Sequence, residues 1–225
     1  MQNKGHSQKG FSLIEILVAM ALVSIILLIA VGSDFSNRKS LDQVLDNYER
    51  IIRFSTDEAS LKNSFVRMNI NFEQENGQNL TLEYSDDKDF IIDADFEKSL
   101  SEVSESEKEF VEEKQKKQDS SFSIVEEFDA EEFEVPPNVR VLGVGSELTE
   151  SFRTTGKTQI YFYPNGQKDA SIIIFATEDE IATLEIEPFR RVINRTYAEM
   201  PEEIPSDYEE FLIDRANEIY KEWLE

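Results

Sequence analysis

The residues best placed to do chemistry lie at the start of the chain, where Glu15 stands inside an otherwise apolar run. A charged side chain inside a membrane segment costs about 3 kcal/mol or more, so an acidic residue in such a place is expected to be functional. Immediately before the run, Lys9 and Gly10 precede Phe11. Gly10 has no side chain to obstruct a protease at the backbone, which makes this step a candidate processing site. Lys4 and Lys9 favour a cytoplasmic position for the segment before it.

Composition excludes several other kinds of chemistry. The chain has no cysteine, which removes disulfides, thiolate zinc sites and cysteine nucleophiles. Its single histidine, His6, precedes the candidate processing site. A processed chain therefore has neither a Ser-His-Asp triad nor a histidine-ligated metal. Carboxylate chemistry stays open, because Asp and Glu number 47.

The excess of acidic over basic residues also limits which partners the protein can bind. The formal net charge is -24, from 47 acidic and 23 basic residues. Such a surface repels phosphate backbones over most of its area, so we expect no nucleic-acid partner, with a local basic patch as the open alternative. At 225 residues, the chain is long enough for one medium domain with a core, plus an anchor.

The element that must position Glu15 is a long apolar helix. Residues 16–31 read ILVAMALVSIILLIAV, and with 11–15 they reach the roughly 20 residues that a bilayer-spanning helix needs. We therefore predict a transmembrane helix over 11–32. The alternatives are a buried core helix and a cleaved secretory signal. A signal usually has a shorter apolar core and an A-x-A-like site, which the following GSDFSNRKSLDQ lacks.

The segment KGFSLIEILVAMALVSIILLIA strongly resembles the leader and first helix of type IV pilins and type II secretion pseudopilins. A leader glycine, a phenylalanine, a Ser-Leu-Ile-Glu step and a long apolar run occur there in register. The resemblance implies a prepilin leader at 1–10, cleavage by a prepilin peptidase between Gly10 and Phe11, and N-methylation of the new Phe11 amine. It also implies a role in assembly for Glu15, the fifth residue of the processed chain. It identifies a class and not a member.

The resemblance also suggests a partner for Glu15, namely the Phe11 amine of a neighbouring subunit. Two opposite unit charges attract strongly in a low dielectric, and an unpaired one is costly to bury. We hypothesise that this pair sets the axial register of subunits while their apolar helices pack.

After Gly32 the pattern becomes amphipathic, which predicts a helix over 33–60. Steps of three and four place the following residues on one face: Leu41, Val44, Leu45, Tyr48, Ile51, Ile52 and Ser55. This helix either continues the first one or is separated from it at Gly32, Ser33 and Asp34.

Residues 61–196 are predicted to form an antiparallel sheet domain. Alternation at 65–72 and 80–84, around Asn76 and Gly77, indicates a hairpin. A Pro-Asn-Gly turn at 164–166 predicts that the strands on either side of it pair as a second hairpin. The strands of this second hairpin are predicted at 159–163 and 170–175. Further strands are predicted at 90–92, 139–144, 181–186 and 190–193.

An acidic insertion interrupts this domain at 97–134. It opens with EKSLSEVSESEKEFVEEKQKKQDSS, which is rich in Glu, Ser and Lys and poor in apolar residues. We interpret it as a solvated or disordered insertion. Carboxylates suit calcium, but no EF-hand spacing occurs, so we predict no metal and no other cofactor.

The tail at 197–225 is predicted to be helical from 205 onward. Ser206 is a candidate cap, with Glu209 three residues later. One side of the helix carries Tyr208, Phe211, Leu212, Arg215, Ile219 and Trp223. We favour docking of this helix on its own domain over binding to a partner subunit. The predicted fold is α+β, a pilin-like long N-terminal helix on a small antiparallel sheet with a C-terminal helix.

The segment QIYFYPNGQKDASIIIF resembles the strand-turn-strand signature of H-type minor pseudopilins and their FimT-like relatives. This resemblance implies a structural subunit of a type II secretion pseudopilus or a type IV pilus-like filament. Its helix would lie in the inner membrane, its domain in the periplasm, and its partners would be other pilins and membrane lipid. The acidic insertion and the tail depart from the compact pattern of that subfamily.

Two other functions stay open as alternatives. A FimT-like pilin that captures DNA needs clustered cations, for which the candidates are Arg190, Arg191, Arg195, Lys157 and Lys168. A membrane-anchored enzyme needs a catalytic motif, and the sequence contains no nucleophile motif, phosphate loop or metal-ligand spacing. We therefore predict that the protein is not an enzyme.

Overall fold

The computed structural model of the chain describes residues 13–72, 79–87, 116, 119–128, 133, 135–201 and 207–225, except for the side chains of 27–36 and 79. Several predicted features lie outside these residues. They are the leader 1–10, Phe11, the turn at Asn76 and Gly77, the strand at 90–92 and most of the insertion 97–134.

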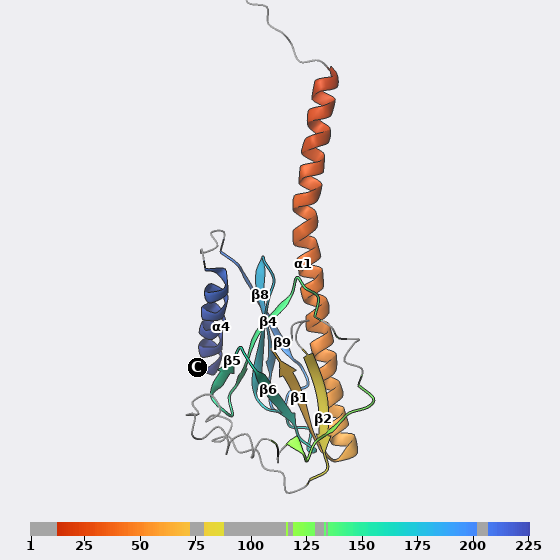
Figure 1. The fold of residues 1–225 in the computed structure, drawn as a ribbon, viewed down its shortest axis with the longest axis vertical. Helices are drawn as coiled ribbons and strands as arrows, with labels where there is room; N and C mark the ends of the chain where they lie inside the picture. Colours follow the sequence, from red (N-terminus) through yellow and green to blue (C-terminus); the bar gives the residue numbers. More distant parts are fainter. Residues whose placement is uncertain are drawn as a thin grey trace, which may run out of the picture.

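Two antiparallel sheets form the body of the described fold, beside one long helix (Figure 1). The first sheet has the order β3-β2-β1-β6, at Ser123–Ile124, Asn79–Ser85, Phe65–Asn71 and Lys157–Phe162. The second has the order β5-β4-β7-β8-β9, at Ser151–Arg153, Arg140–Ser146, Ser171–Ala176, Glu180–Ile186 and Asn194–Glu199. With helices α1 (Leu13–Lys62) and α4 (Tyr208–Leu224), they confirm the α+β class. The prediction of a single sheet is wrong.

Helix α1 runs unbroken for 50 residues, so the step at Gly32 does not divide it. The helix ends at Lys62, after which Asn63 takes a left-handed φ of 51°. The amide of Ser64 then bonds to the carbonyl of Ala59 at 3.1 Å. Such a bond around a left-handed residue closes the last turn of a helix, and it turns the chain directly into β1.

The C-terminal half of α1 packs on the sheets through the face that its periodicity predicts. Buried residues of this half are Leu41, Val44, Leu45, Tyr48, Ile51, Ile52, Ser55 and Ala59. Tyr48 meets Phe175 of β7 edge to face, with ring centroids 4.9 Å apart. The buried Ser55 hydroxyl donates to the Ile51 carbonyl at 2.9 Å, so it adds no unsatisfied polar group to the core.

The predicted second hairpin forms its turn but not its ladder. One bridge joins Phe162 to Lys168, after which the two strands enter different sheets. Strand β6 pairs with β1, whereas β7 pairs with β4 and β8. All six residues of β7 are buried, because its two faces contact separate hydrophobic clusters. Such a strand belongs at the centre of a sheet and not in an edge hairpin.

The last predicted strand is displaced. Residues 190–193 form a loop, and β9 begins only at Asn194. Of the two apolar residues in this segment, Ile193 is buried but Val192 is 66% exposed.

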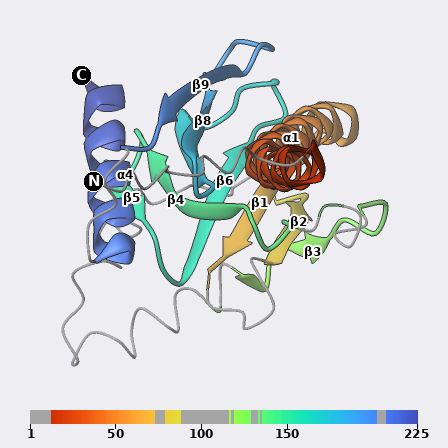
Figure 2. The same ribbon diagram turned by 90° about the horizontal axis from the view of Figure 1, so that it is seen from above.

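Helix α4 covers the face of the second sheet that α1 leaves open, so that this sheet lies between the two helices (Figure 2). Leu212, Ala216 and Tyr220 are buried against it. The Tyr220 hydroxyl donates to the carbonyl of Ser146 on β4 at 3.0 Å. The prediction that the tail docks on its own domain is confirmed.

The predicted cap of α4 is corrected by one residue. The helix is capped by Asp207, whose carboxylate accepts from the amide of Glu210 at 3.3 Å. Because the first helical residue is Tyr208, the capping position falls on Asp207 and not on Ser206, which lies outside the described residues.

Candidate assembly site

Glu15 lies in the first turn of α1, at the end of the helix that projects beyond the sheets (Figure 1). A carboxylate in this position is favourable, because the first turn of a helix carries partial positive charge. Gly10 and Phe11 lie outside the described residues, so the processing step and the pairing of Glu15 stay predictions.

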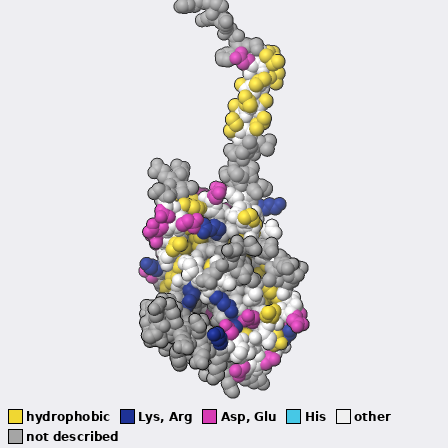
Figure 3. Space-filling view, in the orientation of Figure 1, with side chains coloured by type: hydrophobic (Ala, Val, Ile, Leu, Met, Phe, Trp, Pro, Cys, Tyr) yellow, Lys and Arg dark blue, Asp and Glu magenta, His cyan; other side chains and the backbone are white. Residues whose placement is uncertain are grey.

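The N-terminal part of α1 is an exposed apolar rod, which we define as residues 13–26. Figure 3 shows apolar side chains over this projecting part. Its large apolar side chains are all more than half exposed, from 52% for Ile16 to 79% for Leu13. An exposed apolar surface of this extent marks a site that another apolar surface covers. By length and apolarity, no helix among the described residues is able to cross a membrane, so the predicted span 11–32 is not confirmed.

One polar side chain of the rod is satisfied within the helix itself. The Ser24 hydroxyl donates to the carbonyl of Met20 at 2.8 Å. The hydroxyl therefore needs no external partner. Glu15 is the one ionisable residue of the rod, which makes it the natural determinant of specificity there.

A set of polar contacts fixes α1 to the second sheet near the point where the helix leaves the domain. We call this set the exit clasp, made by Asn37, Arg38, Asp42, Asp179, Glu180 and Tyr197. The Arg38 guanidinium lies 3.9 Å from the centroid of the Tyr197 ring and pairs with Glu180. The Tyr197 hydroxyl donates to Asp42 at 2.9 Å.

The clasp favours the charged form of Arg38. Desolvation lowers the pKa of this guanidinium, but the carboxylates of Glu180 and Asp42 outweigh it, so that the pKa is raised. Burial raises the pKa of the Tyr197 hydroxyl, and its bond to Asp42 adds to the effect. Arg38 therefore stays charged and Tyr197 stays protonated near neutrality.

A second ion-pair group lies one to two turns further along α1. Arg195 of β9 donates to Glu49 and to Asp46, in both cases at 2.6 Å. Desolvation lowers the pKa of Arg195, but the hydrogen bonds to Glu49 and Asp46 outweigh this effect, so that the pKa is raised. Together with the exit clasp, this group aligns α1 along β8 and β9 and so sets the direction in which the rod projects.

A family model matches the segment that contains the processing site and the rod. Residues 5–31 match the prokaryotic N-terminal methylation motif. The N-terminal segment is type IV prepilin-like. The motif supports a type IV pilin- or pseudopilin-like substrate of a prepilin peptidase. No curated protein and no solved structure matches the chain significantly.

Four of the five cations considered for DNA capture do not gather on one exposed face. Arg195 forms an ion pair with Glu49 of α1, and Arg190 forms one with Glu187 at 3.0 Å. Lys168 is buried, with its Nζ donating to a backbone carbonyl. Lys157 begins β6 in the other sheet. The contacts thus disfavour a DNA-binding patch.

Within the described ranges, no group of three or more His, Asp or Glu side chains could hold a metal ion. Most of the acidic insertion considered for calcium lies outside those ranges.

Sequence reasoning missed the exit clasp, and it considered Arg195 only as a candidate cation for DNA capture. The pair of Arg38 and Asp42, four residues apart and 3.5 Å from each other, was accessible from helical spacing. The contacts of Arg38 and Asp42 with Glu180 and Tyr197 bridge 142 and 155 residues, and no local signal predicts such pairs.

Proposed function

We propose that this prepilin-like chain is a minor pilin or pseudopilin of the H type, a structural subunit without enzymatic activity or cofactor. A prepilin peptidase cleaves it between Gly10 and Phe11 and the new amine of Phe11 is methylated. The subunit then enters a type II secretion pseudopilus or a type IV pilus-like filament that supports protein secretion. The observation that carries the proposal is the methylation motif at residues 5–31, which continues into an exposed apolar rod.

Before assembly, the rod needs an apolar environment, which the inner membrane supplies. The span 11–32 would cross it once, with Lys4 and Lys9 on the cytoplasmic side and the domain in the periplasm. Assembly then moves the rod from lipid into a bundle of similar helices, where protein contacts replace lipid contacts. The continuity of α1 supports this account, because one rigid helix joins the rod to the domain.

Glu15 supplies the polar determinant in this bundle. Apolar helices alone slide along one another with little preference, whereas a buried charge favours the one register in which it meets its opposite. The amine of Phe11 on a neighbouring subunit is the proposed partner. The H-type assignment is supported by the aromatic strand, the Pro-Asn-Gly turn and the apolar strand between residues 159 and 175.

Substitution of Glu15 by Leu tests the assembly role. The variant is expected to insert into the membrane normally, because it is more apolar, but to lose most of its incorporation into filaments. Cysteine crosslinking between subunits in sheared filaments, in a chain that has no native cysteine, measures incorporation.

The matched control is Ser24→Ala, because the Ser24 hydroxyl bonds only within its own helix. It should assemble like the unmodified chain. Normal incorporation of the Glu15 variant would remove the register role. Absence of the unmodified chain from every filament fraction would overturn the proposed function itself.

A further inference from the structure

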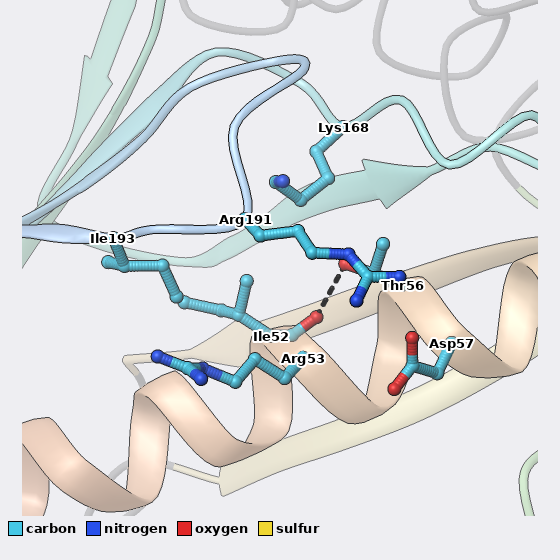
Figure 4. Close-up of a pocket in the computed structure, with 7 residues that line it drawn as sticks. All are labelled: Ile52, Arg53, Thr56, Asp57, Lys168, Arg191 and Ile193. Carbon is cyan, nitrogen blue, oxygen red and sulfur yellow. Dashed lines mark hydrogen bonds between the residues drawn. The ribbon is translucent and has the colours of Figure 1, made fainter.

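A cavity of about 180 Å³ lies between α1 and the loop that joins β8 to β9. Its lining includes two cations that approach from the sheet side, a carboxylate and an arginine on the helix side, and two isoleucines (Figure 4). These residues are Lys168, Arg191, Asp57, Arg53, Ile52 and Ile193. The cavity is far along α1 from the rod and plays no part in the assembly site.

Lys168 is a buried cation at this cavity. It is 4% exposed, and its Nζ donates to the Arg190 carbonyl at 2.6 Å. An ammonium group has three donors, and this carbonyl is the one acceptor found among the described residues. Burial lowers the pKa of Lys168, and the neighbouring Arg191 lowers it further, against an opposing effect of Glu187. A bound anion would favour the charged form of Lys168 and so oppose the lowering of its pKa by burial and by Arg191.

Arg191 extends from the loop across the cavity toward α1 (Figure 4). Neither Arg191 nor Lys168 makes an ion pair with any carboxylate of the described residues, although the chain carries a net charge of -24. Other arginines nearby are paired, namely Arg53 with Glu49, Arg190 with Glu187, and Arg195 with Asp46 and Glu49. Asp57 lines the opposite wall without forming such a pair. Two cations thus converge where the fold supplies little compensating charge.

We propose that this cavity binds a carboxylate carried on a short apolar stem. The planar fork of Arg191 matches a carboxylate in two parallel hydrogen bonds, and Lys168 adds a point charge beside it. Ile52 and Ile193 offer apolar surface to the stem, which a bare inorganic anion would not use. The volume is below that of a typical drug-sized site, so it suits a group the size of one side chain.

Two sources supply this chemistry: a free short-chain acid, and a glutamate side chain of another protein chain. The test titrates the full chain in detergent micelles by calorimetry with butyrate, with N-acetylglutamate α-amide, with neutral butyramide and with inorganic phosphate. Both carboxylates should bind at least about tenfold more tightly than butyramide, as expected when a charge-assisted hydrogen bond is lost. The tighter of the two identifies the source.

Variants locate the binding. Arg191→Gln should weaken carboxylate binding about tenfold, and Asp57→Asn should strengthen it, because a competing negative charge is removed. Arg190→Gln is the matched control, since its guanidinium pairs with Glu187, and it should change affinity less than twofold. Equal binding of butyrate and butyramide, tighter binding of phosphate than of butyrate, or equal losses in the Arg190 and Arg191 variants would each overturn the proposal.

Discussion

Asp169 is the most strongly perturbed carboxylate among the described residues. It is 8% exposed, and it accepts hydrogen bonds from the Tyr161 amide at 3.1 Å and from the Tyr163 hydroxyl at 2.6 Å. Burial outweighs these bonds and raises the pKa of Asp169 to about 6, from 3.8. The folded chain therefore binds this proton more tightly than the unfolded chain does.

The sign of the resulting pH dependence follows from linkage. Because the folded state holds more protons between pH 4 and about 6, the contribution of Asp169 to stability falls as pH rises through this window and is constant above it. The difference in pKa corresponds to at most about 3 kcal/mol. Substitution Asp169→Asn should remove this slope, so that the variant gains stability relative to the unmodified chain as pH rises from 4 to 6.

Urea unfolding, followed by the fluorescence of the single tryptophan, Trp223, measures this difference at each pH. Glu178→Gln, at an exposed position, is the control that should leave the slope unchanged. A difference between the Asp169 variant and the unmodified chain that does not change with pH would show that this carboxyl does not titrate as described.

At the scale of the element, the orientation of α1 depends on its ion pairs with β8 and β9. Arg195→Gln removes the cation that pairs with Asp46 and one of the two arginines, Arg195 and Arg53, that pair with Glu49. Since Arg195 is partly buried and Asp46 is exposed, the expected loss of stability is about 1 kcal/mol. Hydrogen exchange should quicken in α1 around residues 42–50, whereas Arg190→Gln, which breaks an exposed pair, should not change it. Unaltered exchange in the Arg195 variant would contradict the alignment role.

Helix α4 depends on a close approach to β4 that only glycine allows. A Cβ placed on Gly145 would lie 2.3 Å from the Tyr220 ring. Gly145→Ala should therefore destabilise the domain by about 1–3 kcal/mol. The double variant with Tyr220→Ala should lose less than the sum of the two single changes, because the ring that clashes is gone. Additive losses, measured by thermal unfolding, would mean that the helix does not rest on this glycine.

Local pattern predicted most strands but not the sheets that contain them. This pattern located β1, β2 and β4 within one or two residues. It paired β6 with β7, because a Pro-Asn-Gly turn between strands is a hairpin signal. The sequence SIIIFA of β7 carried the opposite signal, since a strand apolar on both faces requires cover on both sides. The continuity of α1 through Gly32 had no local signal at all.

At the scale of the whole molecule, the chain divides into an apolar rod and an acidic domain that holds it. The rod was the part most fully predicted from sequence, because its apolar residues and Glu15 are consecutive in the chain. The exit clasp and the carboxylate cavity were not predictable, because each joins α1 to loops and strands more than 100 residues away. Their residues acquire a role only when the second sheet closes on the helix.

The central claim is that this rod becomes the N-terminus of a processed subunit. Intact-mass and fragmentation analysis of the protein isolated from its own cells tests this most directly. The account predicts a chain that begins at Phe11 and carries one methyl group on its amine, and a Gly10→Val variant that keeps its leader. A native protein that still begins at Met1, or that begins after Val31, would contradict it.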